Sequence, residues 1–122
     1  SWAGAYARVN TPFAATEVGC RAAIAALDDA DHLRTSVETA RWARAYLRDE
    51  LDAPTWESGG NFVLAEVGDA EAVAAATQRR GVIVRDCSSF GLPACVRVSC
   101  GTRASTPRAV ETINEVLTEG RA

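Results

Sequence analysis

The sequence predicts an α+β fold in which about three short strands form a small antiparallel or mixed sheet covered by helices. Helical and strand-like segments follow one another in the order two helices, strand, helix, strand, strand and helix. The last two strands are joined by a connection short enough for antiparallel pairing. At 122 residues, of which 48% are hydrophobic, the chain suits one modest core.

The first fifteen residues contain aromatic side chains but no sustained hydrophobic period, so we expect an extended arm or loop over residues 1–15. From Thr16 onward, apolar residues recur at helical spacing. Thr16 is a suitable N-cap and Glu17 favours the positive end of the helix dipole. A first helix should therefore begin here and end in the acidic run at residues 28–31.

A second, longer helix is predicted after that run, with Asp31 as its cap. Charged residues occupy one side of this helix, as is typical of a helix that lies on a core. Residues 52–54, Asp-Ala-Pro, should end it. The apolar residues of the other side fall three or four positions apart along one stripe: Leu33, Val37, Ala40, Ala43, Leu47 and Leu51.

The next segments predict a strand and then a short helix. Aromatic and branched residues over 61–67 are typical of a buried strand. Asp69 then caps an alanine-rich helix that runs to Arg80. Gly81 stands where a left-handed residue commonly ends a helix.

The last part of the chain predicts two strands and a helix. Residues 82–86 and 95–100 are the strands, joined by a turn over residues 88–94 that contains glycine and proline. The pair Thr106-Pro107 predicts the start of the last helix, because proline is favoured at the first helical position. Gly120 should end this helix.

Composition limits the classes of function. The chain has no methionine and no lysine, all thirteen basic residues being arginine, and we expect it to be a piece of a longer polypeptide. The net charge is −3 and the arginines are scattered among carboxylates, which argues against nucleic-acid binding. No apolar run approaches the roughly 20 residues that span a bilayer, and no secretion signal is visible. We therefore expect no membrane association and a cytoplasmic location.

The four cysteines form no C-x-x-C pair, and the single histidine, His32, is distant from them in sequence. This pattern argues against a metal site. Free thiols in a reducing compartment are the favoured interpretation, and a disulfide between Cys87 and Cys95 across the turn is the alternative. His32, at a helix start among acidic residues, is not expected to be a catalytic base.

Arg85 and Arg97 are the main candidates for binding a ligand. Strand alternation places Val96 and Val98 on one face and Arg97 on the other, so Arg97 should point away from the core. Arg85 reaches the same side if its strand is a neighbour. Two guanidiniums together form a receptor for a carboxylate or phosphate, whereas an isolated strand arginine is usually a solvated charge.

The stretch over residues 81–102 reads GVIVRDCSSFGLPACVRVSCGT. Together with GNFVL at residues 60–64 and NTPF at residues 10–13, it resembles class I and II pyridoxal-phosphate-dependent aminotransferases, in particular the histidinol-phosphate aminotransferase and threonine-phosphate decarboxylase branch. The resemblance covers most of the chain. It implies the C-terminal small domain of a fold-type I enzyme, with its connecting helix, over residues 16–122. Residues 1–15 would be an arm or the end of a large-domain segment.

The resemblance also implies roles for individual residues. Arg97 matches the arginine of the family pattern R-[IV]-[ST]-x-G-T, which grips the substrate carboxylate. Arg85 matches the arginine before the turn, which joins it in binding carboxylate or phosphate. Asn61 matches a position whose neighbourhood closes over the substrate. A small anionic amino-acid substrate is therefore implied, together with a homodimer and with pyridoxal 5′-phosphate bound mainly by a large domain of the same polypeptide.

The family's cofactor chemistry requires a lysine amine, and the chain contains none. We therefore expect no catalysis by this chain alone, and we assign none of its residues as catalytic, cofactor-binding or metal-binding. Asp86 is expected to hold Arg85 or a backbone amide in place. The remaining polar candidates suit ordinary turn hydrogen bonding better than extra contacts to the anion, namely Ser88, Ser89 and Thr102.

Two classes of function follow. The first is the substrate-gripping domain of an enzyme acting on a phosphorylated or dicarboxylic amino acid, either by transamination of histidinol phosphate or by decarboxylation of threonine phosphate for cobalamin synthesis. The sequence RDCSSFGLP over residues 85–93 favours the decarboxylase. The second is a stand-alone regulatory module that binds a small anionic metabolite. The absence of lysine favours the module, and the long N-terminal arm argues against it.

Overall fold

The computed structural model describes residues 2–10 and 14–120. The chain divides into two compact units, residues 1–34 and residues 35–122, which are described separately here. Residues 11–13 of the NTPF segment lie outside the described part of the chain. Over the described residues, no helix has both the length and the apolar character needed to cross a bilayer.

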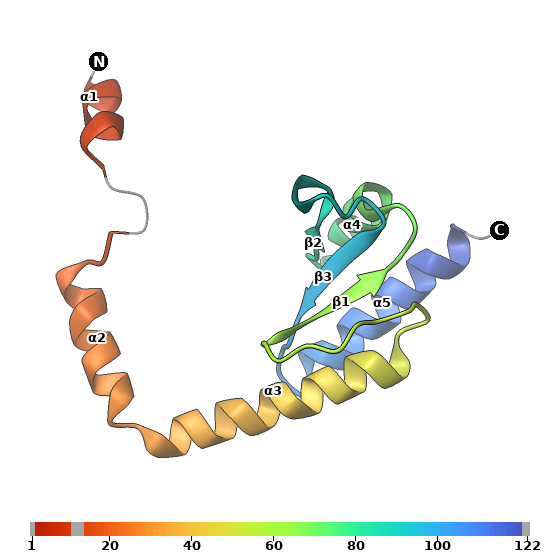
Figure 1. Cartoon of the computed structure of the whole chain (residues 1–122), viewed down its shortest axis with the longest axis horizontal. Coiled ribbons are helices and arrows are strands. Elements are labelled where there is room, and N and C mark those ends of the chain that lie inside the picture. Colours follow the sequence, from red (N-terminus) through yellow and green to blue (C-terminus); the bar gives the residue numbers. More distant parts are fainter. Residues whose placement is uncertain (1, 11–13, 121–122) are drawn as a thin grey trace. The chain divides into compact units, whose positions relative to one another are not determined.

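The first unit contains helices α1 (Trp2–Val9) and α2 (Glu17–Leu27) (Figure 1). The expectation of an extended arm was wrong for residues 2–9. Alanine recurs through that segment, and its high helix propensity favours a helix even where no apolar stripe is present. Helix α2 begins as predicted, because the Thr16 hydroxyl accepts a hydrogen bond from the Gly19 amide at 3.0 Å. None of the residues of α2 is buried.

Helix α3 (Ala30–Glu50) begins in the first unit and continues into the second. Its cap is Asp29 rather than Asp31, because a carboxylate oxygen of Asp29 accepts a hydrogen bond from the His32 amide at 2.8 Å. Asp31 instead lies in the first turn and pairs with Arg34. Only the later part of the predicted stripe is buried, since Leu33 is 63% exposed whereas Leu47 is fully buried.

The second unit is built around a three-stranded antiparallel sheet with the order β1-β3-β2. The strands are β1 (Phe62–Glu66), β2 (Arg85–Asp86) and β3 (Cys95–Ser99). Strand β2 is shorter than the predicted range 82–86. The free edge of β1 is covered by residues 54–56, whose backbone exchanges hydrogen bonds with Leu64 and Glu66. The predicted α+β class, with its small antiparallel sheet, is confirmed.

One face of the sheet forms the core of this unit. Val63 and Ala65 of β1 and Val96 and Val98 of β3 are buried there. Helices α3, α4 (Ala70–Arg79) and α5 (Ser105–Glu119) contribute further apolar side chains to the same cluster. The other sheet face is left with Arg97 and its neighbours, because side chains alternate along each strand. The alternation predicted for Val96 to Ser99 is thus confirmed, whereas Cys95 at the start of β3 is buried as well.

The ends of the later helices follow from local hydrogen bonds. Asp69 caps α4, and Gly81 adopts the left-handed conformation predicted for it, with φ of 80°. The last helix starts at Ser105, two residues before Pro107, the first helical position predicted. The Ser105 amide donates to the Thr102 hydroxyl and the Thr102 amide donates to the Ser105 hydroxyl, and this reciprocal pair fixes the start.

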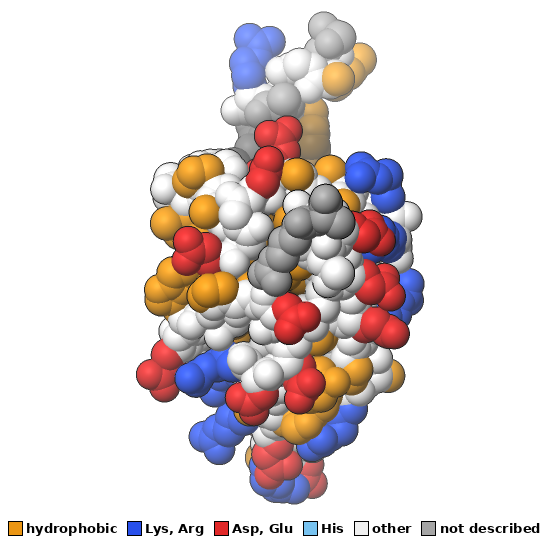
Figure 2. Space-filling model, turned by 90° about the vertical axis from the view of Figure 1, so that its right-hand side faces the viewer, with side chains coloured by type: hydrophobic (Ala, Val, Ile, Leu, Met, Phe, Trp, Pro, Cys, Tyr) orange, Lys and Arg blue, Asp and Glu red, His pale blue; other side chains and the backbone are white. Residues whose placement is uncertain are grey.

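The surface carries both signs of charge. On the face shown in Figure 2, carboxylates and arginines are interspersed, with apolar side chains between them. Arg80 belongs to such a mixed region, where it pairs with Glu115 and Glu119 of α5. Exposed pairs of this kind contribute little to stability individually.

Candidate functional site

The sheet register brings the two predicted arginines together. Arg85 of β2 and Arg97 of β3 are direct cross-strand partners, so their side chains leave the sheet on the same face. Directly opposite residues of an antiparallel pair have Cβ atoms only about 5 Å apart. The hairpin therefore creates two neighbouring positive charges, as the short connection between the last strands predicts.

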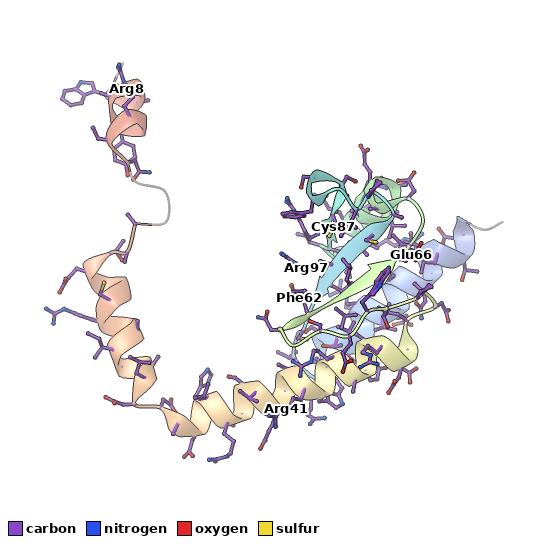
Figure 3. All side chains as sticks on the ribbon, in the orientation of Figure 1. Arg8, Arg41, Phe62, Glu66, Cys87 and Arg97 are labelled. Atoms are coloured by element: carbon purple, nitrogen blue, oxygen red, sulfur yellow. The ribbon has the colours of Figure 1, made fainter. Side chains whose placement is uncertain are left out.

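Each guanidinium lies over an aromatic ring. The Cζ atom of Arg97 is 5.4 Å from the ring centroid of Phe62, and Figure 3 shows these two side chains next to each other on β3 and β1. The Cζ atom of Arg85 is 5.4 Å from the ring centroid of Phe90, in the 3-10 turn at Ser88–Phe90. Arg85 also donates a hydrogen bond from Nη2 to the Ser89 hydroxyl at 3.2 Å.

Neither guanidinium of this pair is bound by a carboxylate among the described residues. Within the part of the chain that the structure describes, neither Arg85 nor Arg97 forms a salt bridge, whereas Arg80 forms two. Asp86 is directed at the turn, where it accepts hydrogen bonds from the Ser88 amide at 2.8 Å and the Ser88 hydroxyl at 2.6 Å. These bonds, with the nearby Arg85 charge, hold the pKa of Asp86 below its ordinary value. Asp86 thus holds a backbone amide, one of its two predicted roles.

The third predicted residue, Asn61, lies apart from the pair in the sheet register. It precedes β1, and its carbonyl accepts a hydrogen bond from the Cys100 amide at 2.7 Å. Arg97 pairs instead with Leu64, three residues farther along. The register therefore joins Arg85 to Arg97 but leaves Asn61 at the end of the sheet, and its substrate contact stays a prediction.

The hydroxyl candidates mostly serve local structure. Ser88 bonds to Asp86, and Thr102 is engaged with Ser105 at the start of α5. Ser89 differs, because its oxygen accepts the hydrogen bond from Arg85. Ordinary turn hydrogen bonding therefore accounts for two of the three, and Ser89 contributes to the arginine pair.

The thiols near the pair are buried in the hairpin. Cys87 and Cys95 are 4% and 5% exposed, and the Cys87 amide donates to the Cys95 carbonyl at 3.1 Å. All four cysteines are free. Burial raises the pKa of the Cys95 thiol, and the Glu66 carboxylate adds to this shift. A neutral buried thiol is a poor nucleophile and a poor metal ligand. No group of three potential metal ligands occurs among the described residues.

The arginine pair faces an open surface. The groove of about 950 Å³ in this unit lies elsewhere, between α4 and α5, and neither arginine lines it. Phe90, whose ring lies under Arg85, is 63% exposed, and Ile83, two residues before Arg85, is 83% exposed. Phe90 and Ile83 together form an exposed apolar rim.

Phe62 and Phe90 contact the arginine pair, but the sequence alone assigned no role to either of them. Phe62 is the diagonal cross-strand neighbour of Arg97, because Leu64 is the direct partner and Phe62 is two residues earlier. Alternation along 61–67 places Phe62 on the face opposite Val63, which was a signal available from sequence. The Phe90 contact carries no such signal, since it depends on the conformation of the turn.

Three comparisons with known proteins agree on one family. The sequence pattern described as aminotransferase class I and II matches residues 1–113. The chain is 70% identical over 119 residues to a histidinol-phosphate aminotransferase of Haloferax volcanii, covering 98% of this chain and 33% of that protein. It is 66% identical over 121 residues to the histidinol-phosphate aminotransferase of Haloarcula marismortui, covering 99% of this chain and 34% of that protein.

Solved structures give the same result. A crystal structure of a protein from Burkholderia pseudomallei K96243, provisionally named an aminotransferase, superposes with a TM-score of 0.69 at 28% sequence identity. The alignment covers 76% of this chain and 30% of that chain. The chain spans about a third of the length of the two histidinol-phosphate aminotransferases that it matches.

Proposed function

Because the chain belongs to the aminotransferase class I and II family, we propose that it supplies the substrate-gripping arginines of a pyridoxal-phosphate-dependent histidinol-phosphate aminotransferase. The observation that carries this proposal is the direct pairing of Arg85 and Arg97 on one sheet face without a neutralising carboxylate. Two guanidinium forks without a salt bridge suit a carboxylate or phosphate, because each fork can donate two parallel hydrogen bonds.

The work of this chain in the reaction is binding and orientation. Pyridoxal phosphate, when bound, acts as an electron sink for carbanion chemistry. The chain contains no lysine, and its described residues include no cluster that we would assign to holding the cofactor. The lysine and the cofactor phosphate site would therefore belong to the rest of the polypeptide. Arg85 and Arg97 would fix the anionic end of the substrate, which is a positioning task.

The substrate follows from the relatives and the charge. Histidinol phosphate carries a phosphate monoester, which is close to doubly charged at neutral pH, and the site offers two positive charges. The names of the relatives favour transamination over the threonine-phosphate decarboxylation toward which the RDCSSFGLP wording leans. They also give no support to a role in cobalamin synthesis. The homodimer, the division at residues 15 and 16, and the cytoplasmic location stay predictions.

The match over residues 1–113 favours an enzyme over the stand-alone regulatory module. The exposed apolar rim around Phe90 and Ile83 supports the same choice, because a large domain of the same polypeptide would cover it.

The first experiment is kinetic and uses the full-length polypeptide loaded with pyridoxal phosphate. Activity is measured with histidinol phosphate and with threonine phosphate side by side, and Arg97→Ala is compared with the unmodified protein. We expect transamination of histidinol phosphate, and a loss on substitution of about 2 to 4 kcal/mol in transition-state binding, the range for removing one partner of a desolvated ion pair.

The matched control is Arg103→Ala. Arg103 is an exposed arginine whose Cζ atom is 4.7 Å from the ring centroid of Trp42, and it is not a strand residue paired with Arg85 or Arg97. It should leave kcat/KM unchanged. Arg97→Lys should also be damaging, since an ammonium group does not reproduce the planar fork. A loss below about threefold for Arg97→Ala would contradict the proposed role.

A further inference from the structure

Two like charges placed directly opposite each other on neighbouring strands repel. Arg85 and Arg97 are held in this arrangement without a salt bridge among the described residues. Something other than a carboxylate must therefore keep their long side chains in place. The contacts that the structure provides are the rings of Phe62 and Phe90 and the hydroxyl of Ser89.

The Phe62 ring is fixed from two sides. Arg97 lies over it, and the backbone of Gly60 lies against it. A Cβ atom added at Gly60 would be 2.9 Å from Cε1 of Phe62, closer than real contacts allow. Gly60 therefore leaves the space that the ring occupies, and it does so with an ordinary backbone conformation, since its φ is not among the positive values found at Gly68, Gly81 and Gly91.

The Phe90 ring is fixed by the turn. It ends the 3-10 helix at Ser88–Phe90, and Gly91 then adopts the left-handed conformation with φ of 79°. The ring is 63% exposed, so burial in the core of this unit does not explain its position. Its described contact is the guanidinium of Arg85, which also reaches back to Ser89 one residue earlier.

An aromatic ring holds a guanidinium differently from a carboxylate. The negative face of the ring attracts the planar cation, but the ring carries no net charge and takes up none of the N–H donors. A carboxylate would occupy the fork and compete with an anionic substrate. A ring therefore restricts the side chain while the charge and the donors stay available.

We infer that Phe62 and Phe90 are positioning residues for substrate binding, each holding one arginine so that both forks are presented together to one anionic group. This inference rests on the proposed function of the arginine pair and adds the residues that organise it. A phosphate monoester suits two such forks, because its three terminal oxygens can accept from both at once.

The test uses the full-length polypeptide with pyridoxal phosphate. KM and kcat for histidinol phosphate, and the inhibition constant of inorganic phosphate, are measured for Phe62→Leu and Phe90→Leu. We expect KM and the inhibition constant each to rise roughly 3- to 30-fold, the range spanned by cation–π contacts. The kcat value should stay within about threefold, because the ring contributes equally to the ground and transition states.

Conservative variants separate positioning from structural damage. Phe62→Tyr and Phe90→Tyr keep an aromatic face, so in these variants KM and the inhibition constant should stay close to the values of the unmodified protein. Gly60→Ala should act like Phe62→Leu, because its methyl group displaces the ring. Trp42→Leu is the matched control, since it removes the ring under Arg103 and should change neither constant.

The outcomes are distinguishable. If both leucine variants change the inhibition constant by less than about twofold while Arg97→Ala raises it strongly, the positioning role is overturned and the proposed function stands. If the tyrosine variants raise KM and the inhibition constant as much as the leucine variants do, the role of the ring face is overturned as well. If Arg85→Ala and Arg97→Ala leave the inhibition constant unchanged as well, the proposed function itself fails. Should Phe62→Leu not fold, Phe90→Leu and the tyrosine variants still decide the question.

Discussion

Replacement of Asn114 by alanine should destabilise the second unit. This α5 side chain holds the end of α3: Nδ2 donates to the Glu50 carbonyl at 2.8 Å, and Oδ1 accepts from the Asp52 amide at 2.9 Å. The Glu50 carbonyl is one of the last four of its helix, which have no partner within the helix. One side chain therefore satisfies two backbone groups and joins the connecting helix to the last helix.

The magnitude follows from these two bonds. A neutral hydrogen bond contributes about 0.5 to 1.5 kcal/mol net, so Asn114→Ala should lower the free energy of unfolding by about 2 kcal/mol. Urea denaturation of the 122-residue chain, followed by circular dichroism, measures this change. Glu111→Ala, an exposed position on the same helix, is the control and should stay within about 0.5 kcal/mol of the original. Asn114→Asp keeps the acceptor for the Asp52 amide, so its free energy of unfolding should lie between those of Asn114→Ala and Glu111→Ala. A loss below about 0.5 kcal/mol for Asn114→Ala would show that water replaces both bonds, and the reasoning would fail.

Two further predictions concern the hairpin that carries the arginines. The hydrogen bonds from Ser88 hold the pKa of Asp86 below its ordinary value of 3.8, so the turn should be stabilised above that pH and lose this contribution as the pH falls through the lowered pKa. The protection of the Ser88 amide from hydrogen exchange, measured relative to its intrinsic exchange rate at each pH, should therefore fall in acid, and an Asp86→Asn chain should show little of this pH dependence. Burial raises the pKa of Cys95, so iodoacetamide at pH 8 should modify exposed Cys20 well before Cys95, as read by mass spectrometry. Equal rates for the two thiols would contradict the buried position of Cys95.

The arginine pair was predictable because two simple rules determine it. Alternation decides which face of β3 Arg97 takes, and a short connection forces antiparallel pairing with the preceding strand. Both rules act through neighbours in sequence. The burial of Val96 and Val98 and the left-handed Gly81 were predictable for the same reason.

Other features depended on choices that the sequence leaves open. Asp29 and Asp31 are both good helix caps, and the hydrogen bond to the His32 amide alone decides for Asp29. Thr106 and Pro107 form a valid helix start, but the reciprocal bonds of Thr102 and Ser105 stabilise an earlier one. Helix α1 was missed because its alanines favour a helix without producing an apolar stripe.

The least predictable features are those made by side-chain conformation. Many exposed arginines have an aromatic residue within a few positions, and only the turn geometry brings Arg85 over Phe90. Asn61 is the opposite case. Its sequence neighbourhood matches a family position, but the sheet register leaves it just before β1, apart from the arginine pair. Resemblance thus identified the residue types, and only coordinates distinguish which of them lie together.

The direct pairing of two arginines has a cost for the stability of this sheet. Like charges opposite each other destabilise an antiparallel pair, and a hydrophobic or oppositely charged residue at position 85 would remove that cost. The chain already contains a mixed arrangement at Arg80, where two glutamates neutralise one arginine. The pair at 85 and 97 has a ring under each guanidinium and no salt bridge among the described residues. Under the proposed function, an anion would offset the repulsion when it binds. The stability of the unliganded hairpin and the affinity for the anion are therefore opposed, and substitutions that improve the first should weaken the second.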